Sequence, residues 1–187
     1  MARRGLSGRL FPAGLTIRAA EPEDSAAIGR VHVDAWRSAY AGLIPDEVLV
    51  GMSQRNQAVQ WARILARPRP RDAVFVGVDE SDGLVGFGNC GPVRSQGTPG
   101  EGEVYTLYVD PDHQGAGIGS ALLKVLLETL ADAGMPSAIV WVLTLNPSRY
   151  FYEAMGGQRF AERDERLWGT ILRETGYVWT QIELPWR

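Results

Sequence analysis

The most constraining feature of the sequence is a glycine-rich turn between a predicted strand and a predicted helix. It covers residues 110–120 and reads Asp-Pro-Asp-His-Gln-Gly-Ala-Gly-Ile-Gly-Ser. Glycines in such a turn permit positive φ and let the backbone approach a ligand closely. The helix that follows offers unpaired N–H groups and the positive end of its dipole, which suit a phosphate or pyrophosphate. The turn therefore predicts an anion-binding loop, with a purely structural turn as the alternative.

Two common phosphate-binding patterns do not fit this turn. A Walker loop requires Gly-Lys-Ser/Thr, and the only lysine of the chain is Lys124. A dinucleotide fingerprint requires G-x-G-x-x-G. Counted from Gly115 its last position is Ser120, and counted from Gly117 it is Leu122. A nucleotide-binding regulator is therefore disfavoured.

The order of the elements predicts a mixed α/β fold around one central sheet, without an internal repeat or a second domain. Apolar runs rich in β-branched and aromatic residues predict the strands, and apolar positions at helical spacing predict the helices. Asp82-Gly83 is a hairpin signal, and Ser53 is expected to cap a helix that restarts after a break near Gly51. Strands are expected at 15–18, 73–78, 84–90, 104–109 and 138–145, with two more ending in 177–184, and helices at 22–42, 45–68, 118–130 and 147–155.

Composition excludes several classes of function. A chain of 187 residues favours one domain, and its single cysteine, Cys90, excludes an intramolecular disulfide and a cysteine-rich zinc site. With two histidines, no metal is expected. A net charge of -3 argues against a protein that binds nucleic acid, and the absence of a long apolar run argues against a membrane-spanning segment. Because Arg9 and Pro12 interrupt a signal-peptide pattern, we expect a cytoplasmic protein with a flexible tail, 1–13, and a domain, 14–187.

The glycine turn matches a different pattern, Q/R-x-x-G-x-G/A, between Gln114 and Gly119. This resembles the coenzyme A loop of the GCN5-related N-acetyltransferases (GNAT). The segment 103–109 followed by Asp-Pro looks like that family's fourth strand, and 146–156 resembles its asparagine-to-glycine helix signature. The order of the elements over 15–184 also follows the family, so the resemblance covers nearly all of the chain outside the tail. The chain departs from the family in having an arginine at 149, where alanine is common, and no basic residue at 114 or 116.

The resemblance implies a fold and a reaction. The fold is a single-domain, mixed but mostly antiparallel central sheet flanked by helices. The reaction is direct attack of a primary amine, expected to belong to a small molecule, on the thioester of acetyl-CoA, which is the cosubstrate. Acetylation of a protein or peptide N-terminus and a non-catalytic acyl-CoA sensor are the alternatives. Acylation of Cys90 is disfavoured because nothing near it in sequence supplies a base.

The resemblance also implies a set of cofactor-binding residues. The fourth strand would bind the pantetheine arm, the glycine turn the pyrophosphate, and the later helix another part of coenzyme A. Asn146 would contact coenzyme A, cap the short helix, or do both. Because the turn lacks an arginine or lysine at 114 and 116, Lys124 or Arg149 would help the backbone N–H groups to bind the phosphates. The implied residues are Leu107, Tyr108, Val109, Gln114, Gly115, Ala116, Gly117, Ile118, Gly119, Ser120, Asn146 and Arg149.

Three residues are the candidates for proton transfer. Tyr152 resembles the family's general acid, with Tyr150 as a rival. Glu103 is the carboxylate that the resemblance places best as a general base, unless it is a solvated strand end. Tyr105, two residues on, would face the same side of the strand and is a second candidate base.

The acceptor site is the least determined by the sequence. Trp36 and Tyr40 lie four residues apart in a W-x-x-x-Y-x-G-x-x-P run seen in a bacterial branch of the family, so they share a helix face and either line a pocket or fill the core. Trp168 and Trp179, in the last strands, are likewise expected either to line the pocket or to fill the core. The expected partner is a small-molecule amine. The identity of the amine, the use of other acyl groups and the oligomeric state stay open, with a homodimer as one option.

Overall fold

The computed structural model describes residues 12–182. The expected tail therefore lies almost wholly outside the described residues, as does the expected end of the last strand at Leu184. The elements, in chain order, are β1 (Leu15–Ala19), η1 (Pro22–Asp24), α1 (Ser25–Ala39), α2 (Asp46–Gly51), α3 (Gln54–Ala66), β2 (Ala73–Asp79), β3 (Gly83–Pro92), β4 (Gly102–Val109), η2 (Pro111–His113), α4 (Ile118–Asp132), β5 (Ala138–Leu143), α5 (Arg149–Ala154), β6 (Gln158–Leu167) and β7 (Thr170–Trp179).

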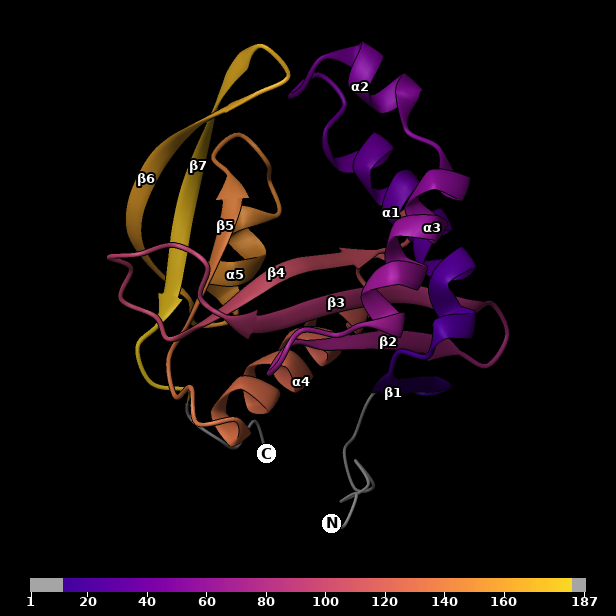
Figure 1. The fold of residues 1–187 in the computed structure, drawn as a ribbon, viewed down its shortest axis with the longest axis horizontal. Coiled ribbons are helices and arrows are strands. Elements are labelled where there is room, and N and C mark those ends of the chain that lie inside the picture. The colour runs from indigo at the N-terminus through magenta and orange to yellow at the C-terminus, as the bar shows by residue number, and fades with distance from the viewer. Residues whose placement is uncertain (1–11, 183–187) are drawn as a thin grey trace.

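The strands form one seven-stranded sheet in the order β1-β2-β3-β4-β5-β7-β6 (Figure 1). Every neighbouring pair is antiparallel except β4 and β5. These two parallel strands are joined through α4, since a parallel connection needs a crossover. The predicted mixed, mostly antiparallel sheet with flanking helices is confirmed.

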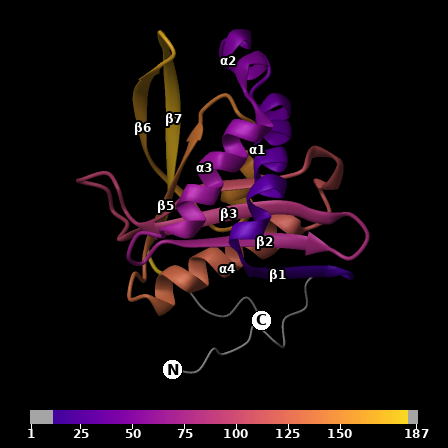
Figure 2. The ribbon, with the colours of Figure 1, turned by 45° about the vertical axis from the view of Figure 1, so that its right-hand side comes forward.

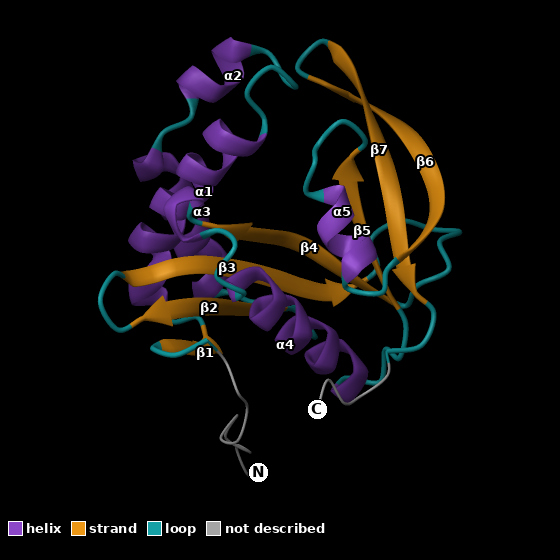
Figure 3. Ribbon diagram, turned by 180° about the vertical axis from the view of Figure 1, so that it is seen from behind, coloured by secondary structure: helices purple, strands orange, loops and turns teal. Residues whose placement is uncertain are grey.

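Helices cover both faces of the first half of the sheet. Ile28 and Val31 of α1 and Trp61 of α3 pack on one face of β2 and β3, and Leu122 and Val125 of α4 pack against the other face (Figures 1 and 3). The β6–β7 hairpin stands at the far end of the sheet and rises beside α1 and α2 (Figures 1 and 2). None of the helices within residues 12–182 has the length and apolarity to cross a bilayer.

Local signals fixed most element ends. Gly83 has φ +74° at the predicted hairpin turn, and the Ser53 hydroxyl accepts the Asn56 N–H at 3.3 Å as the predicted cap. β5 differs from its prediction: it ends at Leu143 rather than 145, because Asn146 N–H bonds to the Leu143 carbonyl and turns the chain. β7 ends at Trp179, within the range 177–184 given for the end of the last strands.

Candidate active site

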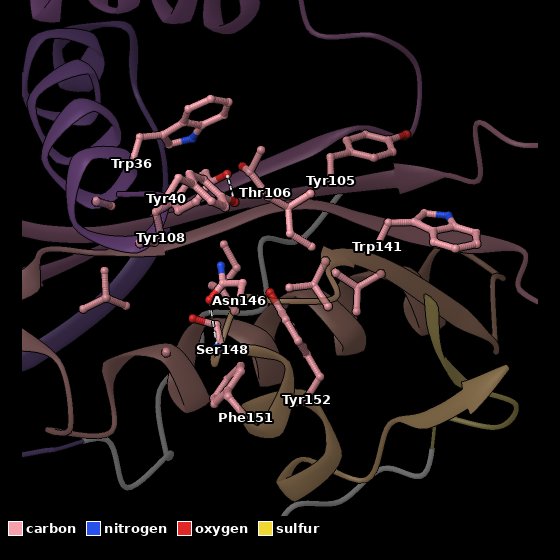
Figure 4. A pocket seen from close by; sticks show the side chains of 18 of the residues that line it. Trp36, Tyr40, Tyr105, Thr106, Tyr108, Trp141, Asn146, Ser148, Phe151 and Tyr152 are labelled. Carbon is pink, nitrogen blue, oxygen red and sulfur yellow. Dashed lines mark hydrogen bonds between the residues drawn. The ribbon is translucent and has the colours of Figure 1, made fainter. Parts of the chain in front are cut away.

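The candidate site is a cavity of ≈ 780 Å³ where β4 and β5 separate. Its walls come from α1, β4, the start of α4, β5, α5 and the β6–β7 hairpin (Figure 4). Strand β4 pairs with β5 only through Gly102 and Glu103. From Val104 onward, within the described residues, its cavity-side edge has no strand partner. Such an edge offers N–H and C=O groups to an extended ligand.

A bulge in β4 shapes this edge. Asn89 of β3 pairs with Thr106 and Cys90 pairs with Val104, so Tyr105 is an extra residue in the ladder. A bulge bends its strand and increases the local twist. Beyond it, the three residues of 107–109 line the cavity as the resemblance implied.

The glycine turn forms one end of the cavity. Gly115 and Gly117 have φ +79° and +81°, and Gly117 is the N-cap of α4. The first N–H groups of a helix lack intrahelical partners, and the residues of the first turn of α4, Ile118, Gly119 and Ser120, line the cavity. Gln114 also lines it, and its amide donates to the Val109 carbonyl at 3.3 Å. Ala116 is exposed and lies outside the lining.

Tyr152 of α5 reaches the cavity from the opposite wall. Its side chain is buried, its ring packs near Tyr177 and Trp179, and its hydroxyl points into the cavity (Figure 4). Burial, with a smaller effect of Tyr40, raises the pKa of Tyr152. The phenol therefore stays protonated at neutral pH and is a hydrogen-bond donor. Its rival Tyr150 is 57% exposed and outside the lining.

Asn146 and Ser148 occupy the turn before α5. The Asn146 side-chain oxygen accepts the Ser148 N–H at 2.9 Å within this turn, whereas the N-cap of α5 is Ser148 and has no side-chain cap hydrogen bond, so Asn146 is not the helix cap. Both residues line the cavity. Arg149 does not line it, because its guanidinium turns to the Tyr150 hydroxyl at 2.7 Å and lies over that ring.

Aromatic side chains form a further part of the cavity wall, on the side from which the acceptor would enter. Trp36 of α1 and Tyr40, which directly follows α1, line it together, with ring centroids 4.9 Å apart, and the Tyr40 and Tyr108 hydroxyls are 3.2 Å apart. Trp168, at the tip of the β6–β7 hairpin, meets Trp36 edge-on at 5.9 Å. Trp179 is instead a buried core residue.

The two predicted bases occupy a different setting from the one expected. Glu103 is 2% exposed, so it is not a solvated strand end. One of its oxygens accepts the backbone N–H of Arg94 and the other accepts the guanidinium, and Glu103 does not line the cavity. Tyr105 lines the cavity, but its hydroxyl donates to the Pro92 carbonyl at 2.7 Å. Burial, with Asp72 nearby, raises the pKa of Tyr105, which makes it a poor base at neutral pH.

Glu174 of β7 is the carboxylate that does line the cavity, among the residues from 12 to 182. It lies opposite Leu143 in the β5–β7 pairing, and its side chain is 17% exposed. Arg163 of β6 donates to one of its oxygens through Nε at 2.7 Å. No local sequence pattern pointed to Glu174, because the β5–β7 pairing that brings it to the site joins segments about 30 residues apart, Leu143 and Glu174.

Cys90 has no place in this site. It is fully buried in β3, and burial, with a smaller effect of Asp72, raises the pKa of its thiol to about 12. Its sulfur lies 3.7 Å from the Leu126 carbonyl. A buried thiol with a raised pKa is not a nucleophile at neutral pH.

Comparison with known proteins then identifies the family. The model described as "Acetyltransferase (GNAT) family" matches residues 28–157. An uncharacterized N-acetyltransferase of Bacillus subtilis (strain 168), YuaI, is 36% identical over 168 residues, which cover 90% of this chain and 94% of that protein. The chain belongs to the GNAT acetyltransferase family.

Other relatives and structures agree with the GNAT assignment. The mycothiol acetyltransferase of Actinosynnema mirum is 29% identical over 154 residues, or 80% of this chain, and the match spans only 46% of that protein. The structure of yncA from Salmonella typhimurium with its cofactor acetyl-CoA has a TM-score of 0.66 at 22% identity, covering 93% of this chain and 97% of that one. The PaiA N-acetyltransferase of Thermoplasma acidophilum, in complex with coenzyme A, has a TM-score of 0.65 at 18% identity, covering 86% of this chain and 97% of that one. At these identities, the two structures establish a shared fold.

Within the GNAT fold, the structure brings most of the predicted residues to one cavity. Glu103, Ala116 and Arg149 lie outside its lining, as do Lys124, named as a possible aid to phosphate binding, and Trp179, named as a possible acceptor-site residue. Residues of the lining that the sequence analysis did not assign to the site include Arg94, Trp141, Ser148, Phe151, Leu172 and Glu174. Of these, Ser148 and Phe151 lie inside the segment 146–156 that carried the resemblance, so that segment was the available signal for them.

Proposed function

We propose that this GNAT protein transfers an acetyl group from acetyl-CoA directly to the primary amine of a small molecule. The observation that carries the proposal is a single cavity that joins a helix N-terminus rich in free N–H groups, an unpaired strand edge and a buried tyrosine hydroxyl. The complexes of yncA with acetyl-CoA and of PaiA with coenzyme A support the choice of cosubstrate.

The glycine turn would hold the pyrophosphate, and the free edge of β4 the pantetheine arm. The turn itself carries no basic residue at 114 or 116, so backbone N–H groups at the start of α4 would supply most of the attraction. Arg149 contributes little in this arrangement, because its guanidinium is turned to Tyr150. We expect binding that depends on loop geometry more than on side-chain charge.

The chemical step would use the cavity-facing groups of both walls. The amine nitrogen bonds to the thioester carbon, the carbon–sulfur bond breaks, and coenzyme A leaves as a thiolate. An N–H group of β4 near 107–109 would donate to the developing oxyanion. Removal of one such donor from an enzyme typically costs about 3–4 kcal/mol of transition-state stabilisation. Direct transfer without an acyl-enzyme fits the burial of Cys90.

Tyr152 would donate a hydrogen bond to the leaving sulfur. On reference values, a full proton transfer from tyrosine to a free thiolate is uphill by about 2 kcal/mol. Because burial raises the pKa of Tyr152, the transfer costs more than that in this cavity. The favoured role is a hydrogen bond that strengthens as charge develops on sulfur.

The acceptor must lose a proton before it attacks and another as the amide forms. For a lysine-like amine, the first loss costs about 4.6 kcal/mol at pH 7, from a pKa of about 10.4. We propose that Glu174, directly or through water, takes the proton released by C–N bond formation. Glu103, the base expected from the resemblance, is held by Arg94 away from the cavity lining.

The shape of the acceptor end favours a small amine over a polypeptide. An acetyltransferase for protein N-termini needs an open groove between the early helices and the last hairpin. Here, Trp168 of the hairpin contacts Trp36 of α1 across that space. Ile44 and Leu49 also cluster with Leu172 of β7. The inward-pointing Tyr152 hydroxyl likewise favours an enzyme over a non-catalytic sensor.

The test is a screen of primary amines with acetyl-CoA, monitored by release of free thiol and by mass spectrometry of the acetylated product. We expect at least one small amine to give stoichiometric thiol and N-acetyl product. Calorimetry should show coenzyme A binding in the micromolar range. The absence of coenzyme A binding at high protein concentration would overturn the proposal.

A further inference from the structure

We infer that the acceptor is a zwitterion of the amino acid type, with Arg94 binding its carboxylate and Glu174 its ammonium group. The inference rests on the proposed function and names the substrate class of the same site. It is carried by two oppositely charged side chains that line the cavity and are linked to each other through one short network.

Arg94 is held in one orientation. Its Nε and Nη2 donate to one oxygen of Glu103 at 3.2 Å and 2.5 Å, and its own backbone N–H donates to the other oxygen at 2.9 Å. Its guanidinium carbon lies 4.2 Å from the centre of the Tyr105 ring. These contacts leave Nη1 as a donor, on a side chain that is 54% exposed and lines the cavity. A planar guanidinium fixed in this way is well suited to a carboxylate.

Glu174 is held on the same side of the cavity. Arg163 donates to its Oε2 through Nε at 2.7 Å and to the Ser95 hydroxyl through Nη1 at 3.2 Å. Ser95 directly follows Arg94 in the chain. The other oxygen of Glu174 is outside the Arg163 contact and is available to an ammonium group. The loop after β3 and the β6–β7 hairpin therefore bring a fixed cation and a fixed anion together.

The placement of the charges in this network favours a zwitterion over a simple amine. Arg94 pairs with Glu103 and Arg163 pairs with Glu174, while Asp72 adds a negative charge beside Arg94 and Tyr105, outside the cavity lining. A monocationic amine would leave the cavity-lining guanidinium of Arg94 without a ligand group to bind. An acceptor with one ammonium and one carboxylate adds no net charge and gives each fixed ion a counterion.

The aromatic wall defines the remainder of the acceptor. Trp36 and Trp168 stand edge to face in the wall of the same cavity, and Leu172, which also lines it, packs in one cluster with Trp36. These surfaces suit an apolar side chain. An amino acid with an aliphatic or aromatic side chain, such as leucine or phenylalanine, is therefore the simplest acceptor that fits.

The test compares acceptors that differ only in the carboxylate. With acetyl-CoA at saturation, kcat/KM is measured for leucine and phenylalanine, their amides, and the amines that lack the carboxyl group. We expect the amino acids to be preferred by about 10–100-fold, a range that allows for solvent screening of the half-exposed Arg94. The preference should appear mainly in KM.

The protein variants assign the preference to Arg94. R94Q alone would leave the buried carboxylate of Glu103 without its ion-pair partner, so the informative variant is the double substitution R94Q/E103Q. It should bring the ratio of amino acid to amide to near one, whereas E103Q alone, which keeps the arginine, should retain the preference. R173Q serves as the matched control, because Arg173 forms an exposed ion pair with Asp164 and lies outside the cavity lining.

The outcomes separate this inference from the proposed function. Efficient acetylation of simple amines with equal or lower kcat/KM for amino acids would overturn the zwitterion and leave the acetyltransferase activity standing. A preference for amino acids that persists in R94Q/E103Q would overturn the role of Arg94. A lack of transfer to any amine or amino acid, despite coenzyme A binding, would overturn both.

Discussion

At the scale of single residues, burial determines what each reactive side chain is able to do. Tyr152 and Cys90 are both buried, and burial raises the pKa of both. The consequences differ because only Tyr152 points into the cavity. A protonated phenol there is a useful donor, whereas a protonated thiol inside β3 has no reaction partner.

The substitution Y152F tests the donor role. Phenylalanine keeps the buried ring that packs near Tyr177 and Trp179, so the fold should be retained. We expect kcat to fall about 100-fold, at the low end of the range for general acid groups, with coenzyme A affinity changed less than about threefold. Y150F is the matched control, because Tyr150 is exposed and outside the lining. An unchanged kcat in Y152F would assign the stabilisation of the leaving sulfur to another group.

The substitution C90A tests direct transfer. Because Cys90 is 0% exposed and lies outside the cavity lining, we expect kcat/KM to stay within about twofold of wild type, with a stability loss of about 1 kcal/mol from the lost sulfur. The wild-type thiol should also resist alkylation until the protein unfolds. A burst of coenzyme A release without an acceptor, abolished in C90A, would instead indicate an acyl-enzyme.

At the scale of the elements, the sequence predicted what depends on local pattern and missed what depends on pairing. The periodic apolar face of α4 and the glycines before it were sufficient to place the turn that forms one end of the cavity. Glu174 was not predictable in the same way. Its position depends on the antiparallel β5–β7 register, which sets it opposite Leu143. Glu103 shows the same limit, because its buried contact with Arg94 requires the return of the chain from β3 to β4.

The substitution G117A tests whether the glycine turn binds the cosubstrate. Gly117 has φ +81°, and a Cβ there would lie 3.4 Å from Pro12. The left-handed conformation costs a non-glycine residue about 1–2 kcal/mol, so the turn should shift and coenzyme A affinity should fall at least about tenfold by calorimetry.

The control for G117A is G83A. Gly83 has φ +74° in the β2–β3 turn, with nothing within 4 Å of an added Cβ and no part in the cavity lining. We therefore expect a similar stability loss by urea denaturation and unchanged coenzyme A affinity. Equal coenzyme A affinity in G117A and wild type would show that the turn is only structural.

At the scale of the whole molecule, the cavity is formed by two parts of the sheet that barely pair with each other. Strands β1–β4 and strands β5–β7 are joined through two residue pairs between β4 and β5, and the cavity opens beyond them. The walls therefore depend on contacts outside the sheet. Trp36 with Trp168 connects α1 to the β6–β7 hairpin, and Arg30 connects α1 to the end of β4.

The Arg30–Asp110 contact makes stability depend on pH. Arg30 donates to Asp110 at 2.6 Å and to the Leu84 carbonyl at 2.7 Å, and Asp110 also accepts the Asp112 N–H. Burial alone would raise the pKa of Asp110, but these hydrogen bonds outweigh it and lower that pKa in the folded protein. The unfolded chain therefore takes up the proton first on acidification. The contribution is fully present above about pH 4, the ordinary aspartate value, and is lost as the pH falls through the lower folded value.

The substitution D110N should remove this contribution. At pH 7 we expect a loss of about 1–2 kcal/mol in urea denaturation, at the lower end for a charged hydrogen bond because Arg30 is 39% exposed. The difference between D110N and wild type should shrink as the pH is lowered below 4, since protonation removes the same charge from wild type. D164N, which breaks the exposed pair with Arg173, should change the pH 7 stability much less. A difference between D110N and wild type that stays constant from pH 7 to pH 3 would mean that the lost contact does not titrate, and that packing at the β4–η2 corner rather than charge holds α1 in place.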